Sequence, residues 1–266
     1  MTSFAQIQGF VYEIDGNIVG NLSMIPFHKN GEFIYLVANV AVHPDFRRKR
    51  IALDLTSQSL KYAKGKGAKS VWLQVRDDNP PAIELYSKMG FVEKCRRSTY
   101  TISPTTKLKD YLGYGIRIKR RTNQEWNQHK HWLREVYPDD VGWNLGLREK
   151  SFEPGFWNFL TRFFSGVSIK NLSIYRDNTL IGFASLEKTN LYADNIWIAC
   201  PEEFDDMVIR ASIPSFRNST YFVRPQTINF PIGRGTKAFE DLGFVKNHTL
   251  IWMEERISPN GFLSEK

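Results

Sequence analysis

The chain has 266 residues, 42% of them apolar and 24% charged, which is typical of a folded globular protein long enough for two domains. It has no apolar run of the roughly 18 residues that a membrane-spanning helix needs and no secretion signal at its start. Its two cysteines are far apart in sequence and form no disulfide framework. We therefore expect a cytoplasmic location and no membrane partner. The net charge is +8, with 14 Lys and Arg against 9 Asp and Glu in residues 1–105 (+5) and 22 against 19 in the rest (+3), which is too modest and too local for a nucleic-acid-binding face.

The first half of the chain alternates strands with helices. In chain order, the sequence predicts strands at residues 10–13, 17–24 and 33–42, a helix at 51–63, a strand at 70–75, a helix at 81–89 and a closing pair of strands at 91–95 and 99–102. The dipeptides Asp15-Gly16 and Asn30-Gly31 are hairpin signals between the first three strands. Gly65 and Gly90 follow the two helices, where glycine commonly ends a helix.

The second half begins after a polar segment at residues 103–110, where we place the domain boundary. A strand at residues 115–119 and a helix at 123–137 are expected next, followed by a stretch rich in Trp and Phe at 143–164.

Two segments of the first half have weak counterparts in the second. Residues 15–23 align with 177–185, and residues 85–92 align with 238–245, so both pairs lie about 150–160 residues apart. Two matches at nearly the same offset favour two copies of one fold. We therefore predict an α/β protein with mixed sheets, divided into domains 1–105 and 112–258.

A basic turn joins the strand that ends at Val42 to the helix that begins at Ile51. It contains four consecutive cations: Arg47, Arg48, Lys49 and Arg50. Cations are unfavourable at a helix N-terminus unless an anion binds there, and the backbone N–H groups of such a turn also favour anions. The turn is therefore predicted to bind a phosphorylated ligand rather than to be a solvated run of charge.

This pattern resembles the GNAT superfamily of acyl-CoA-dependent N-acyltransferases. The family's first motif is a strand, then Arg/Gln-x-x-Gly-x-Gly/Ala, then a helix, and the segment from Arg47 to Ala52 is similar to it. Its second motif, Asn-x-x-Ala-x-x-Leu-Tyr-x-x-x-Gly-Phe, is matched at every named position between Asn79 and Phe91. The resemblance covers residues 10–102 and implies a tandem arrangement in which the second domain is a degenerate copy.

The resemblance also implies roles for individual residues. The backbone of Val40, Ala41 and Val42 would pair with the pantetheine arm of acetyl-CoA. The pyrophosphate would be held by the whole turn: Arg47, Arg48, Lys49, Arg50, Ile51 and Ala52. Asn79 would contact the cofactor, and Tyr86 would protonate the departing thiolate as the catalytic acid. No metal is expected, because the histidines show no ligand spacing with Cys, Asp or Glu.

Two positions depart from the family pattern. Arg50 stands where a glycine is expected, so the turn must close around a Cβ, and the Arg50 side chain could instead reach the 3′-phosphate. Gln74 stands where some members carry a glutamate base, and an amide cannot accept a proton at neutral pH. Deprotonating a lysine-like amine at pH 7 costs about 4.6 kcal/mol, so the general base remains unassigned.

The second domain lacks these features. Its corresponding turn, at residues 198–206, is acidic, and Phe239 replaces the tyrosine, so we expect cofactor in the first domain only. The family usually opens with a strand and two helices that wall the acceptor groove, whereas this chain enters at about the second strand. Either an N-terminal segment lies outside this sequence, or the second domain covers the groove.

The resemblance implies an N-acetyltransferase that moves an acetyl group from acetyl-CoA to a primary amine. The alternative is a non-catalytic acyl-CoA-binding or sensing protein, favoured by Gln74 and Arg50. The acceptor stays open among small-molecule and peptide amines, including protein N-termini, lysines, polyamines, aminoglycosides and amino acids. A tandem-domain monomer is compatible with the sequence, which does not specify the oligomeric state.

Overall fold

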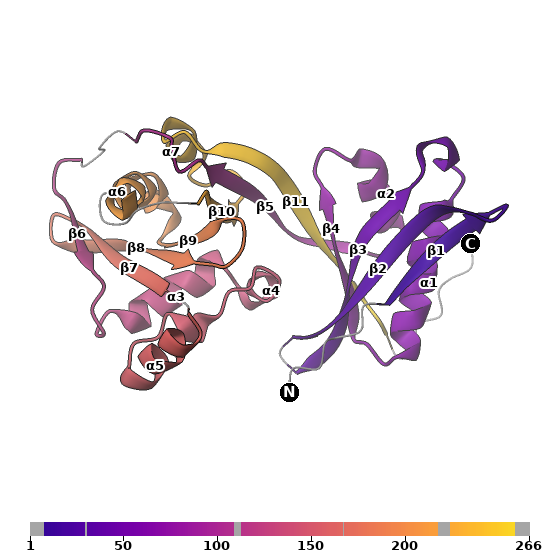
Figure 1. Cartoon of the computed structure of the whole chain (residues 1–266), viewed down its shortest axis with the longest axis horizontal. Coiled ribbons are helices and arrows are strands. Elements are labelled where there is room, and N and C mark those ends of the chain that lie inside the picture. Colours follow the sequence, from indigo (N-terminus) through magenta and orange to yellow (C-terminus); the bar gives the residue numbers. More distant parts are fainter. Residues whose placement is uncertain (1–7, 30, 109–112, 167, 218–223, 259–266) are drawn as a thin grey trace. The chain divides into compact units, whose positions relative to one another are not determined.

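The computed structural model describes residues 8–29, 31–108, 113–166, 168–217 and 224–258. The chain divides into two compact units (Figure 1). Unit 1 comprises Met1–Arg96 and Leu250–Lys266, and unit 2 comprises Arg97–Thr249. The expected domain ranges, 1–105 and 112–258, differ from this division at both junctions, since the C-terminal segment belongs to unit 1. That residues 1–105 and 112–258 are two copies of one fold remains a prediction.

Unit 1 is a mixed sheet with helices packed against it. Its elements are β1 (Gln8–Ile14), β2 (Asn17–Lys29), β3 (Glu32–Val42), the 3-10 turn η1 (Pro44–Phe46), α1 (Ile51–Gly65), β4 (Ser70–Arg76), α2 (Pro80–Lys88), the start of β5 (Val92–Ile102) and the end of β11 (Val245–Arg256). The strand order is β1-β2-β3-β4-β11; β3 and β4 pair in parallel and the other neighbours are antiparallel. The hairpin predicted at Asp15-Gly16 is confirmed, with both residues at positive φ.

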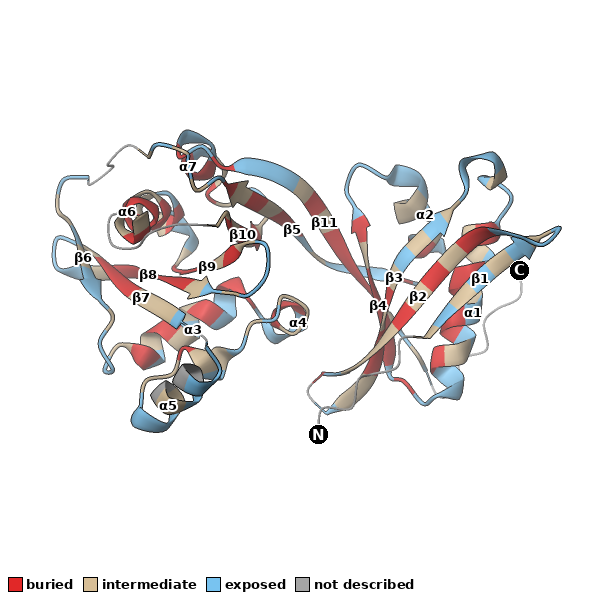
Figure 2. Ribbon diagram, in the orientation of Figure 1, coloured by how far each residue is buried: buried red, intermediate tan, exposed pale blue. Residues whose placement is uncertain are grey.

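One face of this sheet forms a core with α1 and α2. Alternate residues of β4, among them Leu73 and Val75, pack in the same buried cluster as Ile51 and Leu55 of α1, as expected for the period-two pattern of a strand and the amphipathic pattern of a helix. Gly20 on β2 lets the helix approach closely, because a Cβ there would lie 2.8 Å from the Ile51 side chain. Figure 2 shows the resulting buried faces of β2, β4 and α1.

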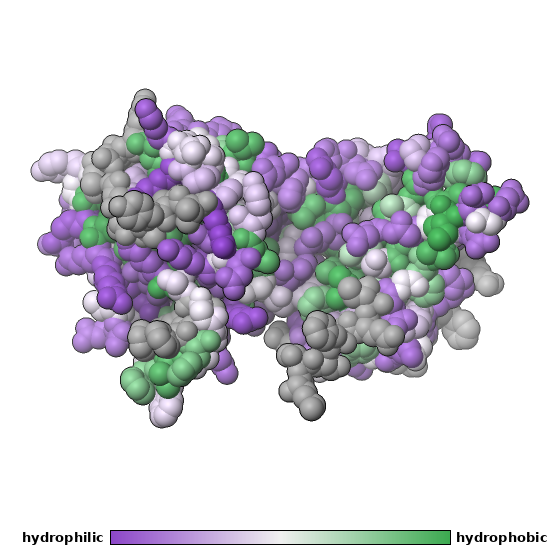
Figure 3. Space-filling view, viewed as in Figure 1, coloured by the Kyte–Doolittle hydropathy of each residue, from purple (hydrophilic) through white to green (hydrophobic). Residues whose placement is uncertain are grey.

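Unit 2 likewise combines a β-sheet with helices. Its elements are β6 (Ile116–Arg120), α3 (Trp126–Val136), α4 (Asp139–Gly142), η2 (Glu149–Ser151), α5 (Phe156–Phe164), β7 (Ser168–Arg176), β8 (Thr179–Lys188), β9 (Asp194–Ala199), η3 (Glu202–Phe204), α6 (Asp205–Arg217), β10 (Gln226–Pro231) and α7 (Thr236–Asp241). The strand order is β5-β10-β9-β8-β7-β6. The expected Trp/Phe-rich stretch contains η2 and α5, and hydrophobic side chains gather at the surface over α5 (Figure 3).

Two long strands belong to both units. Residues 92–96 of β5 lie in unit 1 and residues 97–102 pair with β10 in unit 2. Conversely, residues 245–249 of β11 lie in unit 2 and residues 250–256 pair with β4 in unit 1. Each half of the sequence therefore completes the sheet of the other. The prediction of a closing strand pair at 91–95 and 99–102 is wrong, because these residues form one continuous strand.

Candidate active site

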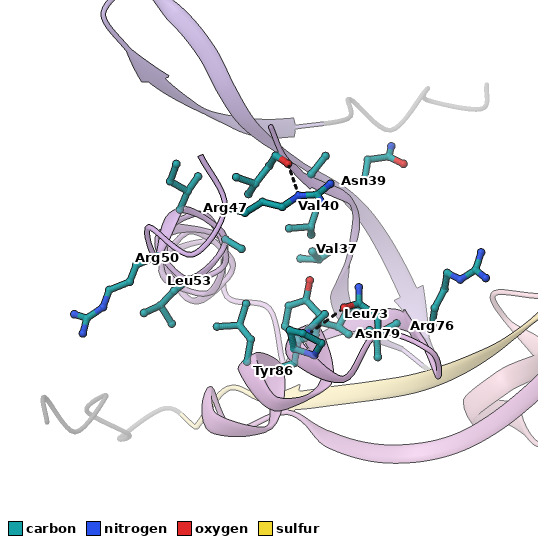
Figure 4. A pocket seen from close by; sticks show the side chains of 18 of the residues that line it. Val37, Asn39, Val40, Arg47, Arg50, Leu53, Leu73, Arg76, Asn79 and Tyr86 are labelled. Atoms are coloured by element: carbon teal, nitrogen blue, oxygen red, sulfur yellow. Dashed lines mark hydrogen bonds between the residues drawn. The ribbon is translucent and has the colours of Figure 1, made fainter. Parts of the chain in front are cut away.

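The predicted site residues converge on one pocket of unit 1, a cavity of about 1120 Å³. It lies between the C-terminal ends of β3 and β4, the start of α1 and the helix α2 (Figure 4). Nearly all the predicted residues line it: Val40, Ala41, Val42, Arg47, Arg48, Arg50, Ile51, Ala52, Asn79 and Tyr86. Lys49 does not; its ammonium lies 4.7 Å from the centre of the Phe46 ring, so the structure gives no support for a Lys49 contact with a ligand in the pocket.

The pocket exists because β3 and β4 stop pairing. Their parallel register runs only from Ile34, opposite Ser70, to Val37, opposite Leu73. Just beyond it, β3 carries a bulge at Asn39, where φ is +54° and the register with β2 shifts. The Asn21 side-chain amide donates a hydrogen bond to the Asn39 carbonyl at 2.9 Å, and a bulge bends its strand.

The bend leaves one edge of β3 without a neighbouring strand among the residues that the structure describes. Ala41 and Val42 remain paired with β2 on their other side, while β4 pairs with neither of them. A backbone segment of this kind can accept an extended ligand as an added strand. This is the geometry that the predicted pairing of Val40, Ala41 and Val42 with a pantetheine arm requires.

The basic turn closes the other end of the pocket. Arg48 and Arg50 both adopt the left-handed conformation with φ of +63°, which side chains with a Cβ adopt at a cost of about 1–2 kcal/mol. Arg50 is the N-cap of α1 and its side chain makes no capping hydrogen bond. The free N–H groups of the first turn are thus available to an anion. The positive φ also explains why a glycine was expected at position 50.

Helix α2 contributes the predicted acid. Asn79 caps this helix by accepting a hydrogen bond from the Ala82 N–H at 3.4 Å, and Pro80 and Pro81 occupy its first turn, where proline is tolerated. One helical turn further on, Tyr86 is 6% exposed and packs edge-on against Phe91. Burial raises the pKa of the Tyr86 phenol, so it stays protonated at neutral pH, and Figure 4 shows its ring reaching into the pocket.

The charge of the pocket is entirely positive among the described residues that line it. These include four arginines, Arg47, Arg48, Arg50 and Arg76, and no Asp, Glu or His.

Three residues that line the pocket were missed by the sequence analysis: Arg76, Asn39 and Leu53. Asn39 could not have been found, because its role depends on the bulge. Arg76 is held by Asp78 through two hydrogen bonds of 2.9 and 2.8 Å.

The corresponding turn of unit 2 is built differently. Asp205, at the start of α6, is 3% exposed and forms an ion pair with Arg234 at 2.7 Å. The protein's own carboxylate thus occupies the helix start that an anionic ligand would need. Phe239 is fully buried and stacks on Tyr100 with ring centres 4.7 Å apart. These contacts support the expectation of cofactor in unit 1 only, which stays a prediction.

Two absences apply to the described part of the chain. There, no three His, Cys, Asp or Glu side chains are grouped so that they could hold a metal ion. Within the same residues, no helix has the length and apolar character that crossing a membrane requires.

Sequence comparisons assign residues 2–91 to the Acetyltransferase (GNAT) family. The chain is 38% identical over 97 residues to an N-alpha-acetyltransferase of Sulfurisphaera tokodaii, a match that covers 32% of this chain and 56% of that protein. It is 37% identical over 68 residues to the [Ribosomal protein bS18]-alanine N-acetyltransferase of Escherichia coli, covering 26% of this chain and 45% of that one. The chain thus spans about half the length of these curated relatives.

Solved structures extend the likeness to both units. A tandem GNAT protein from the clavulanic acid biosynthesis pathway superposes with a TM-score of 0.52 at 15% identity, covering 96% of this chain and 84% of that one. A GCN5-related N-acetyltransferase from Sphaerobacter thermophilus gives a TM-score of 0.57 at 12% identity, covering 95% of this chain and 81% of the other. At these identities the likeness concerns the fold. The family match thus concerns residues 2–91, and the likeness in fold to a tandem GNAT protein extends over both units.

Proposed function

We propose that the protein is an acetyl-CoA-dependent N-acetyltransferase whose active site is the pocket of unit 1. One observation carries the proposal: a cationic turn, an unpaired strand edge and a buried tyrosine line the same cavity. These are receptors for the pyrophosphate, the pantetheine amides and the leaving sulfur of one ligand. Acetyl-CoA carries these groups in that order along its length.

In the proposed reaction, the acceptor amine attacks the thioester carbonyl. The C–N bond forms as the carbonyl becomes tetrahedral, and the C–S bond then breaks. Tyr86 gives its proton to the departing thiolate and is reprotonated from solvent, while the amine loses a proton to water. General acid catalysis of this kind contributes about 10²–10⁴-fold to a rate.

The names of the two curated relatives add a candidate acceptor. One is an N-alpha-acetyltransferase and the other acetylates an alanine of a ribosomal protein. We therefore include the α-amino group of a protein or peptide among the amine acceptors, beside small-molecule amines. A cytoplasmic location remains part of the proposal.

A non-catalytic acyl-CoA-binding protein is the second candidate. It is favoured by the observation that no described residue lining the pocket has a carboxylate or imidazole that could deprotonate an amine. Such a protein would bind acetyl-CoA through the same turn and strand without turnover.

Acetyl-CoA binding and turnover separate these possibilities. Acetyl-CoA at one hundred times its dissociation constant should stabilise the protein by about 2.7 kcal/mol, which thermal unfolding detects; the absence of any shift would refute both candidates. Thiol release with a panel of amines then tests catalysis, and binding without turnover would favour the sensor.

The variant Tyr86→Phe tests the acid. We expect kcat to fall about 10²–10⁴-fold with acetyl-CoA affinity unchanged, since the Tyr86 hydroxyl has no hydrogen-bond partner among the described residues. Tyr12→Phe, on β1 and outside the pocket, is the matched control. Normal turnover by Tyr86→Phe would exclude Tyr86 as the acid.

A further inference from the structure

Gln74 lies at the point where the two central strands of unit 1 separate. Leu73, the preceding residue, is the last of β4 to pair with β3. Because Leu73 and Val75 face the core shared with α1, Gln74 lies on the opposite face of the sheet. Its register partner on β11 is Trp252, a buried and uncharged residue. Gln74 thus lines the pocket at the point where the strands part, and under the proposed function an acceptor entering from that face would pass it.

The Gln74 amide is available to a ligand. The side chain is half-buried, and it forms no hydrogen bond with any other described residue. An amide oxygen accepts a hydrogen bond from an N–H group but cannot remove the proton. Gln74 can therefore hold and orient an amine that is already neutral.

The charges around Gln74 also disfavour a protonated amine. The charged groups that line the pocket with it are all arginines, and the nearest on its own strand is Arg76, whose partner Asp78 is not part of the lining. A bound ammonium would meet like charge and no carboxylate among the lining residues, which lowers the affinity for the protonated form. On the same face of the sheet, β11 carries the buried carboxylate of Glu254, which lies outside the lining and is already paired with the Lys94 ammonium at 3.0 Å. The only other titratable group in the lining is the Tyr86 phenol, which stays protonated.

We infer that Gln74 positions a neutral acceptor amine and that, because an amide at this position supplies no base, the enzyme is restricted to weakly basic amines, with a pKa near 8 or lower. This inference rests on the proposed function. The α-amino groups of peptides belong to this class, and lysine side chains do not. At pH 7 about one in ten α-amino groups is neutral, against about one in 2500 lysine amines, so we expect a preference of about 200-fold.

The pH dependence of the unmodified enzyme provides the first test. The substrates are two peptides of the same length: one with a free N-terminus and no lysine, and one with a blocked N-terminus and a single lysine. With each, kcat/KM should rise about tenfold per pH unit up to the pKa of that peptide's own amine. A plateau well below that pKa, or equal rates for both peptides at pH 7, would overturn the inference.

Substitution of Gln74 provides the second test. Gln74→Glu supplies a base, so kcat/KM for the lysine peptide at pH 7 should rise at least tenfold relative to the N-terminal peptide, and its pH profile should flatten. Gln74→Ala should lower kcat/KM for both peptides without changing their ratio. An unchanged ratio in a folded Gln74→Glu protein that still binds acetyl-CoA would refute the role of Gln74.

These outcomes are distinct from failure of the proposed function. A protein that is stabilised by acetyl-CoA but acetylates neither peptide, nor any amine of the panel, overturns the assignment as an enzyme. An enzyme that acetylates lysine as readily as α-amines at pH 7 leaves the proposed function intact and overturns only the selectivity.

Discussion

His129 should make the stability of unit 2 strongly dependent on pH. Its ring is fully buried, stacks on Phe183 with ring centres 4.7 Å apart, and has its Nδ1 atom 2.9 Å from the Arg121 guanidinium. Burial, reinforced by the Arg121 charge, lowers the pKa of His129 to about 3. The unfolded chain binds this proton near pH 6.5. Stability is therefore fully present above pH 6.5 and is lost as the pH falls from 6.5 towards 3.

The size of this effect follows from the two pKa values. Between pH 7 and pH 5 the unfolded state gains most of a proton while the folded state gains almost none, so the free energy of unfolding falls by about 2 kcal/mol from this residue. Down to pH 3 the total approaches 4–5 kcal/mol. Few single groups in a domain have so large an influence.

Urea unfolding at pH 7 and pH 5 measures the effect. His129→Asn keeps an acceptor for Arg121 but does not titrate, so its stability should fall about 2 kcal/mol less than that of the unmodified protein over this range. The loss of ring packing lowers its stability at both pH values and cancels in the difference. His131→Asn, on the same helix but exposed, is the control. Equal pH dependence in His129→Asn and the unmodified protein would refute the reasoning.

Two further predictions concern unit 1. Arg50→Gly and Arg50→Ala both remove a cation from the pocket, so both should weaken acetyl-CoA binding as measured by calorimetry. Only glycine relieves the strain of the positive φ, so the glycine variant should be more stable than the alanine variant by about 1 kcal/mol in urea unfolding. Equal stability of the two variants would argue against strain at this position. A chain that ends at Thr249 loses the β11 residues that pair with β4, including buried Ile251 and Met253. The lost apolar burial costs about 3–6 kcal/mol of stability, so this truncation should abolish stabilisation by acetyl-CoA. A chain that ends at residue 258 is the control and should behave like the full one.

The site was predictable because its residues are close together in sequence. The turn and helix that carry Arg47, Asn79 and Tyr86 lie within one strand-helix-strand-helix segment, and each residue type has a direct chemical reason to be there. The bulge at Asn39 is different. It depends on the Asn21 amide of a neighbouring strand, and neither residue alone indicates that β3 will bend.

The exchanged strands could not be predicted for a related reason. The predicted strands at 91–95 and 99–102 leave Arg96, Arg97 and Ser98 between them, and charged residues are rarely buried. In the structure, Arg97 is 2% exposed and is hydrogen-bonded to the Asn229 side chain and the Val136 carbonyl. Ser98 likewise pairs with Thr249 at 2.8 Å. These partners come from more than 30 residues away, so the local pattern gave no sign of them.

The exchange of β5 and β11 has a consequence for synthesis on the ribosome. Residues 70–76 of β4 emerge first, and their partners at 250–256 follow about 175 residues later. At 5–20 residues per second, roughly 10–35 s separate the two. Throughout that interval β4 is without its β11 neighbour, so the sheet that carries the pocket of unit 1 is completed only after residues 250–256 have been made. Residues between positions 37 and 86 line the pocket, and a strand made about 170 residues later determines when the sheet beneath them can be completed.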